Sequence, residues 1–473
     1  MPDPIATLES LTKTIANRAT DAEKHEKYYR GVQPLKFATE EWAKFHAARY
    51  GGFADNWCGV VVDSEAERLA LTGIRLPVDE DAPPPDAGTV RSDPGARRLW
   101  DVWERSNGDA ISSQGFVTSL TSRRSFTMVW GEDPRITWEH PGQVAVAHDP
   151  ETGKRTAAVK TWTDGTNDYA TVYYPDHLLK YQRPRGERKG VTEHGGDVTM
   201  FNRDGWEPRE GTEFRISNPI GEVPIVEWPN RPMLAGDPLS EVEGVAAMQD
   251  AVNLMWGYLF TAADQASWTQ RVLIGAEPPK IPVLDSNGNV VGEKLVDMDR
   301  LAKNRFLFLQ DPDVKAHQFE PAKLDVFTAV IEQAVQHIAA QTRTPPHYLM
   351  GKMVNANAEA LKVAETGLVK KTIEAQTFFG PAARETFRLA ALAMGDRALA
   401  DRMARGHVQW RNPEMTSDAQ VADAILKKRQ AGYPFRTILE DLDYPDFRID
   451  RIIGQIEDEQ RSMLVADVDA MGL

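Results

Sequence analysis

The sequence of 473 residues contains a single cysteine, Cys58. One cysteine excludes an intrachain disulfide framework, and it also excludes a zinc site built from several cysteine ligands. Cys58 stands in the apolar segment 56–63, where a small thiol side chain is readily buried. We therefore interpret Cys58 as a structural residue and not as a reactive thiol.

Long apolar runs are also absent from the sequence. No stretch approaches the roughly 20 apolar residues that span a bilayer. The first residues, Met1-Pro2-Asp3-Pro4, lack the basic region and the following apolar stretch of a signal peptide. We expect a protein that is made and assembled in a cytoplasm and that has no membrane partner.

Basic residues are in deficit. Lysine and arginine number 55 against 70 aspartates and glutamates, which gives a net charge of −15. A protein that grips nucleic acid over a wide surface is usually basic, because the neutralisation of phosphates drives that binding. An acidic surface instead suits a soluble enzyme, or a conduit through which DNA must slide.

Common catalytic motifs are missing as well. The Gly-Lys pairs at 153–154 and 351–352 lack the other glycine and the Ser/Thr of a P-loop. The His-Glu pair at 25–26 is not followed by the second histidine of a zinc-protease helix, and there is no G-x-S-x-G elbow. These absences make a non-enzymatic role the main interpretation, although they do not exclude an enzyme.

Scattered acid–base residues leave one enzymatic alternative. The ten histidines show no common metal-binding spacing. Asp418 and Asp423 fall on neighbouring turns of an expected helix, and paired carboxylates can perform acid–base chemistry. A solvated helix face is the simpler interpretation. The alternative is a carboxylate-based enzyme such as a nuclease, and another structural protein is a third reading.

The composition, 41% hydrophobic and 26% charged, allows a packed core, and the length suits two or three domains or one elaborate domain. In the first part of the chain, the apolar spacing predicts helices over 5–15 and 21–29, the second ending at Gly31. Helical sequence follows over 39–72 and again over 96–106.

From residue 125 the pattern becomes β-like. An antiparallel meander is predicted, with polar turn sequences at 149–153 and 164–168 and one more strand near its end. The predicted strands are 126–130, 143–148, 156–163, 170–174 and 223–228.

Residues 239–267 predict a helix of nearly thirty residues that contains no lysine or arginine. Glu243, Asp250 and Asp264 recur at multiples of seven residues and would form an acidic stripe on one face. A charged stripe is commonly a solvated face, so this pattern alone does not assign a role.

A small β-containing segment comes next, with strand-like sequence at 271–274 and 305–309 around a turn at 285–289. Pro321 then begins a helix that ends near Arg343, where Thr344-Pro345-Pro346 breaks it.

A loop over 347–357 leads into a helix from Ala358, in which Gly380-Pro381 should introduce a kink or a break. The C-terminal region, 396–473, predicts short helices at 418–430, 435–442 and 446–470. The fold class is therefore α+β.

Five segments, distributed over nearly the whole chain, carry a family resemblance. They are Tyr28-Tyr29-Arg30-Gly31; Asn56-Trp57-Cys58-Gly59-Val60-Val61-Val62-Asp63; Gly236-Asp237-Pro238-Leu239-Ser240-Glu241-Val242 continuing to Gln249-Asp250-Ala251-Val252-Asn253; Thr344-Pro345-Pro346-His347-Tyr348-Leu349; and Ala422-Asp423-Ala424-Ile425-Leu426-Lys427-Lys428 with Ala431-Gly432. In this order and spacing, the chain resembles the portal proteins of tailed double-stranded-DNA phages, in the branch common among long-tailed phages of Gram-positive and actinobacterial hosts.

The resemblance implies a portal fold with a named role for each segment. The implied parts are a wing at 1–237, a first stem helix at 238–267, a clip at 268–320, a second stem helix at 321–343, a tunnel loop at 344–357, a long kinked wing helix at 358–395 and a helical crown at 396–473. It further implies a ring, typically of twelve subunits, at one capsid vertex of the virion.

The same resemblance implies site residues and partners. The tunnel-loop residues Lys352, Asn355 and Asn357 would touch DNA, although this loop is short and has few charges for the family. The acidic stripe Glu243, Asp250 and Asp264 would line a channel wall that repels phosphate. The clip residues expected to dock partners are Lys280, Asn287, Lys294 and Arg300. The implied partners are the terminase large subunit, a head–tail adaptor, the major capsid and scaffold proteins, and the DNA itself. No cofactor or metal is expected.

Overall fold

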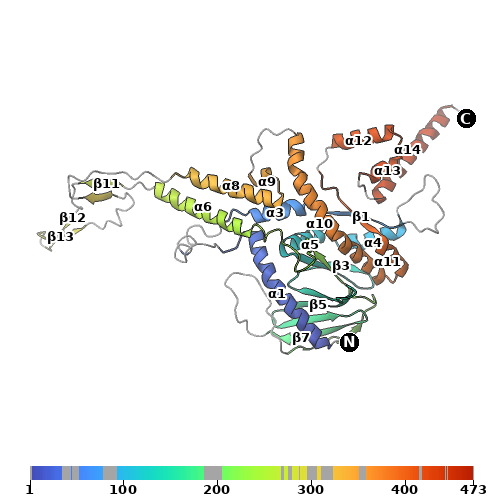
Figure 1. The fold of residues 1–473 in the computed structure, drawn as a ribbon, viewed down its shortest axis with the longest axis horizontal. Coiled ribbons are helices and arrows are strands. Elements are labelled where there is room, and N and C mark those ends of the chain that lie inside the picture. Colours follow the sequence, from blue (N-terminus) through green and yellow to red (C-terminus); the bar gives the residue numbers. More distant parts are fainter. Residues whose placement is uncertain are drawn as a thin grey trace. The chain divides into compact units, whose positions relative to one another are not determined.

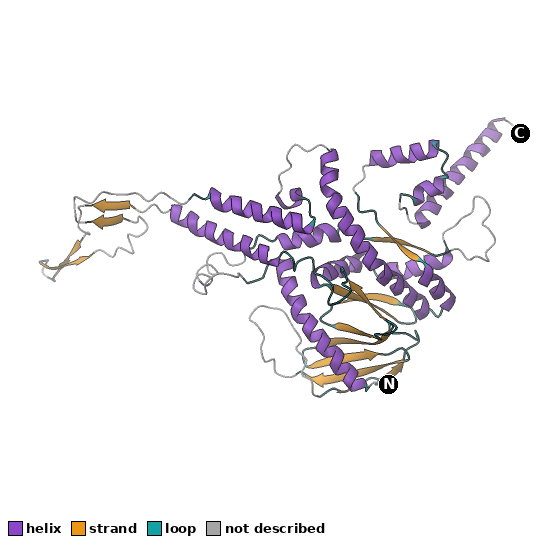
Figure 2. Ribbon diagram, viewed as in Figure 1, coloured by secondary structure: helices purple, strands orange, loops and turns teal. Residues whose placement is uncertain are grey.

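A computed structural model of the chain describes residues 3–34, 44, 53–77, 93–185, 205–267, 271–274, 280–286, 288–295, 306–309, 323–350, 358–414, 418–442, 444 and 446–471. The chain divides into two compact units. Unit 1 consists of residues 1–33, 56–246 and 339–473, and unit 2 consists of residues 34–55 and 247–338. Helices and strands occur in both units, which confirms the α+β class (Figures 1 and 2).

Unit 1 contains a six-stranded sheet in the order β4-β5-β6-β7-β8, with β9 also paired to β7. All its pairings are antiparallel, which confirms the meander for the predicted strands 143–148, 156–163 and 170–174. The predicted strands 126–130 and 223–228 are not part of it, because they pair with each other in a separate sheet. The strand bounds are β4 Val144–His148, β5 Arg155–Thr163, β6 Asn167–Tyr173, β7 His177–Pro184, β8 Glu207–Pro208 and β9 Arg215–Ser217.

Each face of this sheet is covered by a different element. Helix α1, Pro4–Arg30, buries Leu8, Leu11 and Ile15 against one face. The other face packs against Phe126 and residues near β10, which belong to a three-stranded sheet with the order β10-β2-β3. That sheet comprises β2 Arg124–Trp130, β3 Arg135–Glu139 and β10 Ile225–Pro229. Alternation of apolar residues along the strands supplies both cores.

Behind the three-stranded sheet, α5 and α10 pack through aromatic rings. Helix α5 spans Gly108–Ser122, and α10 spans Ala358–Ala393. Phe116 stacks on Phe379 with centroids 5.7 Å apart, and Trp138 lies 4.6 Å from Trp228. Helix α10 contains Pro381 within its length, so the proline does not break the predicted long helix.

The remaining elements of unit 1 surround this core. They are α3 Trp57–Ala66, β1 Leu71–Arg75, α4 Pro94–Arg105, α9 Pro346–Met350, α11 Arg397–Arg405, β15 His407–Trp410, α12 Asp418–Gln430, α13 Phe435–Glu440 and α14 Asp446–Met471. Strand β15 pairs antiparallel with β1, far away in sequence, so part of the predicted crown segment 396–473 is hydrogen-bonded to the N-terminal half of the chain. The three C-terminal helices match their predicted positions.

Unit 2 contains most of two helices and four strands. Helix α6 spans Ala246–Ser267 and α8 spans Asp325–Thr342. Strands β11 Arg271–Ile274 and β14 Phe306–Leu309 pair in parallel, and β12 Lys280–Leu284 and β13 Val290–Leu295 form an antiparallel hairpin. Ile331, Val335 and Ile338 recur every three to four residues along α8 and are buried.

Several sequence predictions need correction. The loop predicted over 347–357 does not begin at 347, because residues 346–350 form the short helix α9, with Pro346 at its first position. The helices predicted at 5–15 and 21–29 are one helix, because no glycine or proline interrupts residues 16–20 and the first helix-ending residue is Gly31, at φ 69°. Helical structure was predicted through residue 72, but residues 71–75 form β1, whose partner β15 could not be read locally. The helix predicted from 239 begins at Ala246.

Candidate channel and positioning site

The segment before α6 is held by hydrogen bonds that a helix could not make. The backbone N–H of Leu239 donates to Asn230 O at 3.1 Å, and that of Glu241 donates to Leu120 O at 2.9 Å. The Ser240 hydroxyl donates to Thr121 O at 2.6 Å. These bonds tie residues 239–241 to the ends of α5 and β10, which explains why the helix begins several residues later than predicted.

The predicted acidic stripe is not one exposed face. Glu243 lies in the turn before α6, where its carboxylate is 2.9 Å from Arg123 Nη2 and 44% exposed. Asp250 is only 2% exposed, and Asp264 is half-buried. The seven-residue spacing failed because Glu243 is outside the helix and Asp250 is on its buried side. Glu243 and Asp264 remain the carboxylates of this set that could face a channel.

The β12–β13 hairpin presents apolar side chains to solvent in the single chain. Ile281 is 57% exposed, Val290 63% and Val291 65%. Lys280 lies 3.3 Å from Glu293, and Lys294 is exposed. An isolated two-stranded hairpin is only marginally stable in water, so these side chains suit a surface that another chain covers.

Five of the predicted site residues lie outside the described residues: Lys352, Asn355, Asn357, Asn287 and Arg300. Their DNA-contacting and partner-docking roles stay predictions, as do those of Lys280 and Lys294. The described segments on either side of 351–357 carry a polar network that the sequence did not predict.

Arg68, just after α3, is the centre of that network. Its Nη2 donates to the Tyr348 hydroxyl at 2.8 Å and to Glu365 Oε2 at 3.1 Å, and its Nη1 donates to Pro413 O at 2.7 Å. The Tyr348 hydroxyl in turn donates to Glu365 Oε1 at 3.2 Å. Tyr348 precedes the segment 351–357 and Glu365 follows it, so one guanidinium binds both sides.

A buried charge cluster lies further along α10. Lys371 Nζ is 2.8 Å from Glu65 Oε2 and 2.7 Å from Glu241 Oε2, and all three side chains are no more than 3% exposed. Glu241 also accepts a hydrogen bond from Asn230 Nδ2 at 3.1 Å. The lysine therefore joins α3, α10 and the segment that leads into α6.

The charges of this cluster shift one another. Burial raises the pKa of Glu65 to about 7, and the Glu241 carboxylate adds to that rise, while Lys371 opposes it. Glu241 keeps a lowered pKa despite its burial, because Lys371, Asn230 and Arg231 stabilise its ionised form. The pKa of Lys371 is raised by the two carboxylates against the effect of burial. Near neutral pH, the cluster thus holds an ammonium, one firmly ionised carboxylate and one carboxyl that titrates.

The first two segments of the family resemblance meet in unit 1 as a structural joint. Asn56 Nδ2 donates to Tyr29 O at 2.6 Å, and Asn56 Oδ1 accepts from Gly59 N at 3.3 Å, which caps α3. The Tyr29 hydroxyl donates to Asp63 Oδ1 at 2.8 Å. Burial and the neighbouring Asp63 carboxylate raise the pKa of Tyr29 to about 12, so the phenol stays a donor.

A second joint lies in unit 2. Asn253 Oδ1 accepts from Asp55 N at 3.1 Å, and the amide of Gln249 donates to Asp55 O. The Trp256 indole donates to Asp55 Oδ2 at 2.7 Å. The glutamine and asparagine of the third resemblance segment therefore fasten residue 55 to α6, which is a structural role and not a catalytic one.

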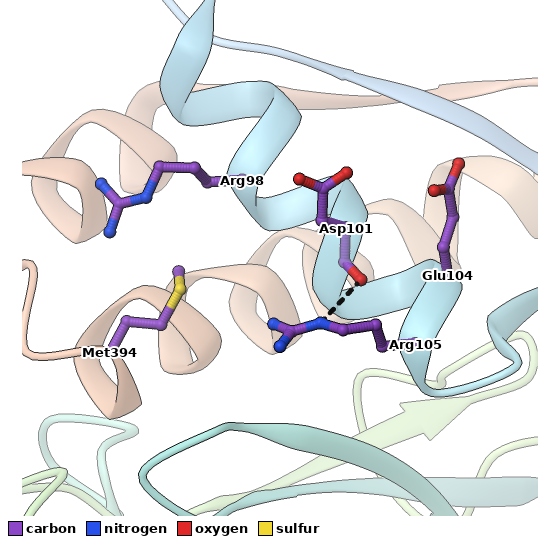
Figure 3. Close-up of a pocket in the computed structure, with 5 residues that line it drawn as sticks. All are labelled: Arg98, Asp101, Glu104, Arg105 and Met394. Carbon is purple, nitrogen blue, oxygen red and sulfur yellow. Dashed lines mark hydrogen bonds between the residues drawn. The ribbon is translucent and has the colours of Figure 1, made fainter.

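The enzymatic alternative finds little support among the described residues. A surface pocket of about 500 Å³ is lined by Arg98, Asp101, Glu104, Arg105 and Met394. Figure 3 shows its two arginines and two carboxylates along α4, with Arg105 Nε donating to Asp101 O at 3.3 Å. Arg98 also pairs with Asp396 at 2.8 Å. These charges are balanced in sign, and Arg98, Asp101 and Arg105 form ion pairs with residues outside the pocket, which is typical of a solvated surface.

The two carboxylates considered for acid–base chemistry, Asp418 and Asp423, both lie on α12. Asp423 on α12 pairs with Lys427 at 2.7 Å on an exposed face. Within the described ranges, no group of three or more histidine, cysteine, aspartate or glutamate side chains is placed to hold a metal ion. Among those same residues, no helix has both the length and the apolar character that crossing a membrane requires.

Comparison with known proteins decides between the remaining structural readings. Residues 9–461 match the model of the phage portal protein family described as SPP1 Gp6-like. The chain belongs to this family. Its described joints, buried cluster and hairpin are therefore features of a portal subunit, a structural component of the phage head–tail connector and of the virion.

Named relatives agree with the family. The portal proteins of Mycobacterium phages D29 and L5 are each 28% identical to this chain over 388 residues, covering 77% of this chain and 70% of each relative. Among solved structures, the chain is similar to a chain from the neck of a native gene transfer agent particle computed with C12 symmetry. That match has 12% identity, a TM-score of 0.41, and covers 87% of this chain and 95% of that one. A chain from the virion of the same kind of particle gives a TM-score of 0.40, with 12% identity over 84% of this chain and 91% of that one.

Proposed function

We propose that copies of this portal subunit, twelve in the virion, form a ring around a channel through which double-stranded DNA enters and leaves the capsid. The family match over residues 9–461 carries this proposal. The division of the chain supports it, because α6, α8 and the four strands between them form most of a unit of their own. In this assignment α6 and α8 are the stem, and residues 268–320 are the clip.

The partners follow from the same assignment. The exposed apolar side chains of β12 and β13 would be covered by neighbouring copies and by the docked proteins, namely the terminase large subunit during packaging and a head–tail adaptor afterwards. Lys280, Lys294, Asn287 and Arg300 are the proposed polar contacts. The major capsid and scaffold proteins would contact the wing, and assembly would take place in the host cytoplasm. We further propose that the subunit has no catalytic activity of its own.

Imaging of the purified chain by negative-stain electron microscopy tests the proposal. We expect rings with a central hole, and native mass spectrometry should give a mass that is a multiple of the subunit mass. A compact monomer that cleaves DNA in the presence of a divalent metal would overturn the proposal in favour of the nuclease alternative. A closed particle without a channel would instead favour another head–tail structural role.

A further inference from the structure

The end of α3 meets α10 through two ion pairs of opposite polarity. Glu65 pairs with Lys371, and Arg68 pairs with Glu365, with nitrogen–oxygen distances of 2.8 Å and 3.1 Å. At the end of α3 and just after it, the negative Glu65 precedes the positive Arg68 along the chain. On α10 the order is also negative then positive, so the two segments match when they run in opposite directions.

This arrangement defines one position of α10 along its axis. Glu365 and Lys371 are six residues apart, about 9 Å along a helix. A slide of α10 by one turn, about 5.4 Å, would separate both pairs at once. The Glu65 and Lys371 side chains are 1% and 2% exposed, so water could not replace the lost partners. An unpaired buried charge is strongly unfavourable, and the slide is therefore resisted.

Each pair also binds a third segment. Arg68 holds Tyr348 of α9, which immediately precedes residues 351–357, and Lys371 holds Glu241, five residues before α6. The side chains of Arg68 and Glu365 are 10% and 12% exposed, more than those of Glu65 and Lys371, so this pair can be altered without leaving a fully buried charge.

We propose that Glu65 and Arg68 form a register clamp that fixes α10 along its axis and so fixes the two chain ends from which residues 351–357 depart. In terms of the proposed function, on which this inference rests, these are positioning residues for the loop that meets DNA. Neither residue needs to touch DNA. The clamp sets where the loop begins and ends in every subunit of the ring.

A charge-swap experiment on the assembled ring tests the clamp. Arg68→Glu should place two carboxylates together, and hydrogen exchange of the backbone amides in 346–350 and 358–371 should become roughly tenfold faster or more. Rings should still form, but particles assembled with this variant should contain less DNA. The double variant Arg68→Glu/Glu365→Arg restores opposite charges and should restore both exchange protection and DNA content.

The matched control is Arg97→Glu, which makes the same charge change at an exposed pair, where Arg97 Nε lies 3.0 Å from Asp101. It should leave exchange in 346–371 and DNA content unchanged. If Arg68→Glu prevents folding, Tyr348→Phe removes a single hydroxyl and should accelerate exchange in 346–350 while α10 stays protected.

Two results would overturn the clamp. One is wild-type hydrogen exchange in rings of Arg68→Glu together with wild-type DNA content in particles assembled with this variant. The other is a swapped variant that regains exchange protection but not DNA content, because the register would then not be what packaging needs. Failure of the proposed function looks different: the wild-type chain itself would form no rings or support no packaging, whatever the exchange data show.

Discussion

Lys371 is a buried charged side chain at the α3–α10 contact, 2% exposed, and its two carboxylate partners differ in character. Glu241 is held ionised by three neighbours, whereas burial raises the pKa of Glu65 to about 7. The folded state therefore favours protonated Glu65 relative to the unfolded chain. Stability from this group is fully present below its ordinary pKa of 4.5 and is lost as the pH rises through about 7.

The variant Glu65→Gln isolates this effect, because glutamine has the shape of the protonated acid and cannot ionise. We expect the Tm of the wild type, relative to that of Glu65→Gln, to fall between pH 5 and pH 8. Thermal unfolding of both proteins at intervals over this range is the measurement. A difference in Tm that does not change with pH would show that Glu65 is not the titrating group.

Other groups make the comparison with the variant necessary. Burial lowers the pKa of His25 and of His148, so the folded state favours their neutral forms and their contribution to stability rises with pH over the same range. The carboxylates Glu26 and Glu385 have lowered pKa values, so their contribution to stability changes only as the pH falls below about 4.5. All four are unchanged in Glu65→Gln, so their effects cancel in the difference.

Among the elements, helix α5 packs very closely against its neighbours at a glycine. Gly115 lies against Trp138, and an added Cβ would come within 1.9 Å of the indole ring. That ring is itself fixed between Phe116, at 5.6 Å, and Trp228, at 4.6 Å. Glycine is normally unfavourable inside a helix, so its presence here reflects the close approach of the tryptophan.

Gly115→Ala should therefore lower the free energy of unfolding by about 1–3 kcal/mol, because the extra methyl group overpacks a closed aromatic cluster. Gly367→Ala in α10 is the matched control. Its Cβ would meet Arg343 atoms at 3.5 Å or more, which is ordinary contact, and better helix propensity should raise stability by about 0.5–1 kcal/mol. Chemical denaturation of both variants measures this, and equal shifts of the same sign would contradict the packing argument.

The same element shows why sequence periodicity missed part of the fold. Helices α8 and α10 and strands β4 to β6 carry clear apolar repeats and were predicted close to their observed bounds. Helix α5 was missed because small polar residues, among them Ser112, Ser119 and Thr121, are buried along with its apolar ones. Strand β7 was missed because its core face includes Arg183, whose charge is paired with Asp168 inside the protein.

The prediction of site residues likewise succeeded where the signal was local in the sequence and failed where it was not. The predicted burial of Cys58 is confirmed, and it could be predicted because the apolar neighbours of Cys58 in segment 56–63 are visible in the sequence. The Arg68 and Lys371 networks were not predicted, because their partners are separated by more than a hundred residues and only the fold brings them together. Asp250 was misplaced because a seven-residue spacing gives the face of a helix but not which face is buried.

At the scale of the whole molecule, the net charge of −15 decides how the proposed ring could handle DNA. A subunit with this excess of acidic residues offers few basic side chains to phosphate, so any attractive contact with DNA must come from a few places. Lys352 lies in the predicted tunnel loop. Apart from His347, it is the only basic residue in the sequence between Pro345 and Ala358. Reversal of its charge removes attraction and adds repulsion in every subunit.

Lys352→Glu should therefore reduce the DNA content of particles without preventing ring assembly. The chain offers a closely matched control, since Lys154 also follows a glycine and lies exposed in the β4–β5 turn, so Lys154→Glu makes the same charge change away from the predicted channel. Ring formation is scored by negative-stain imaging, and DNA content is measured per assembled particle. If Lys352→Glu and Lys154→Glu particles both package like the wild type, Lys352 is a solvated loop lysine and the channel works without this contact. If both variants lose DNA to the same extent, the loss follows from net charge and not from a position in the channel.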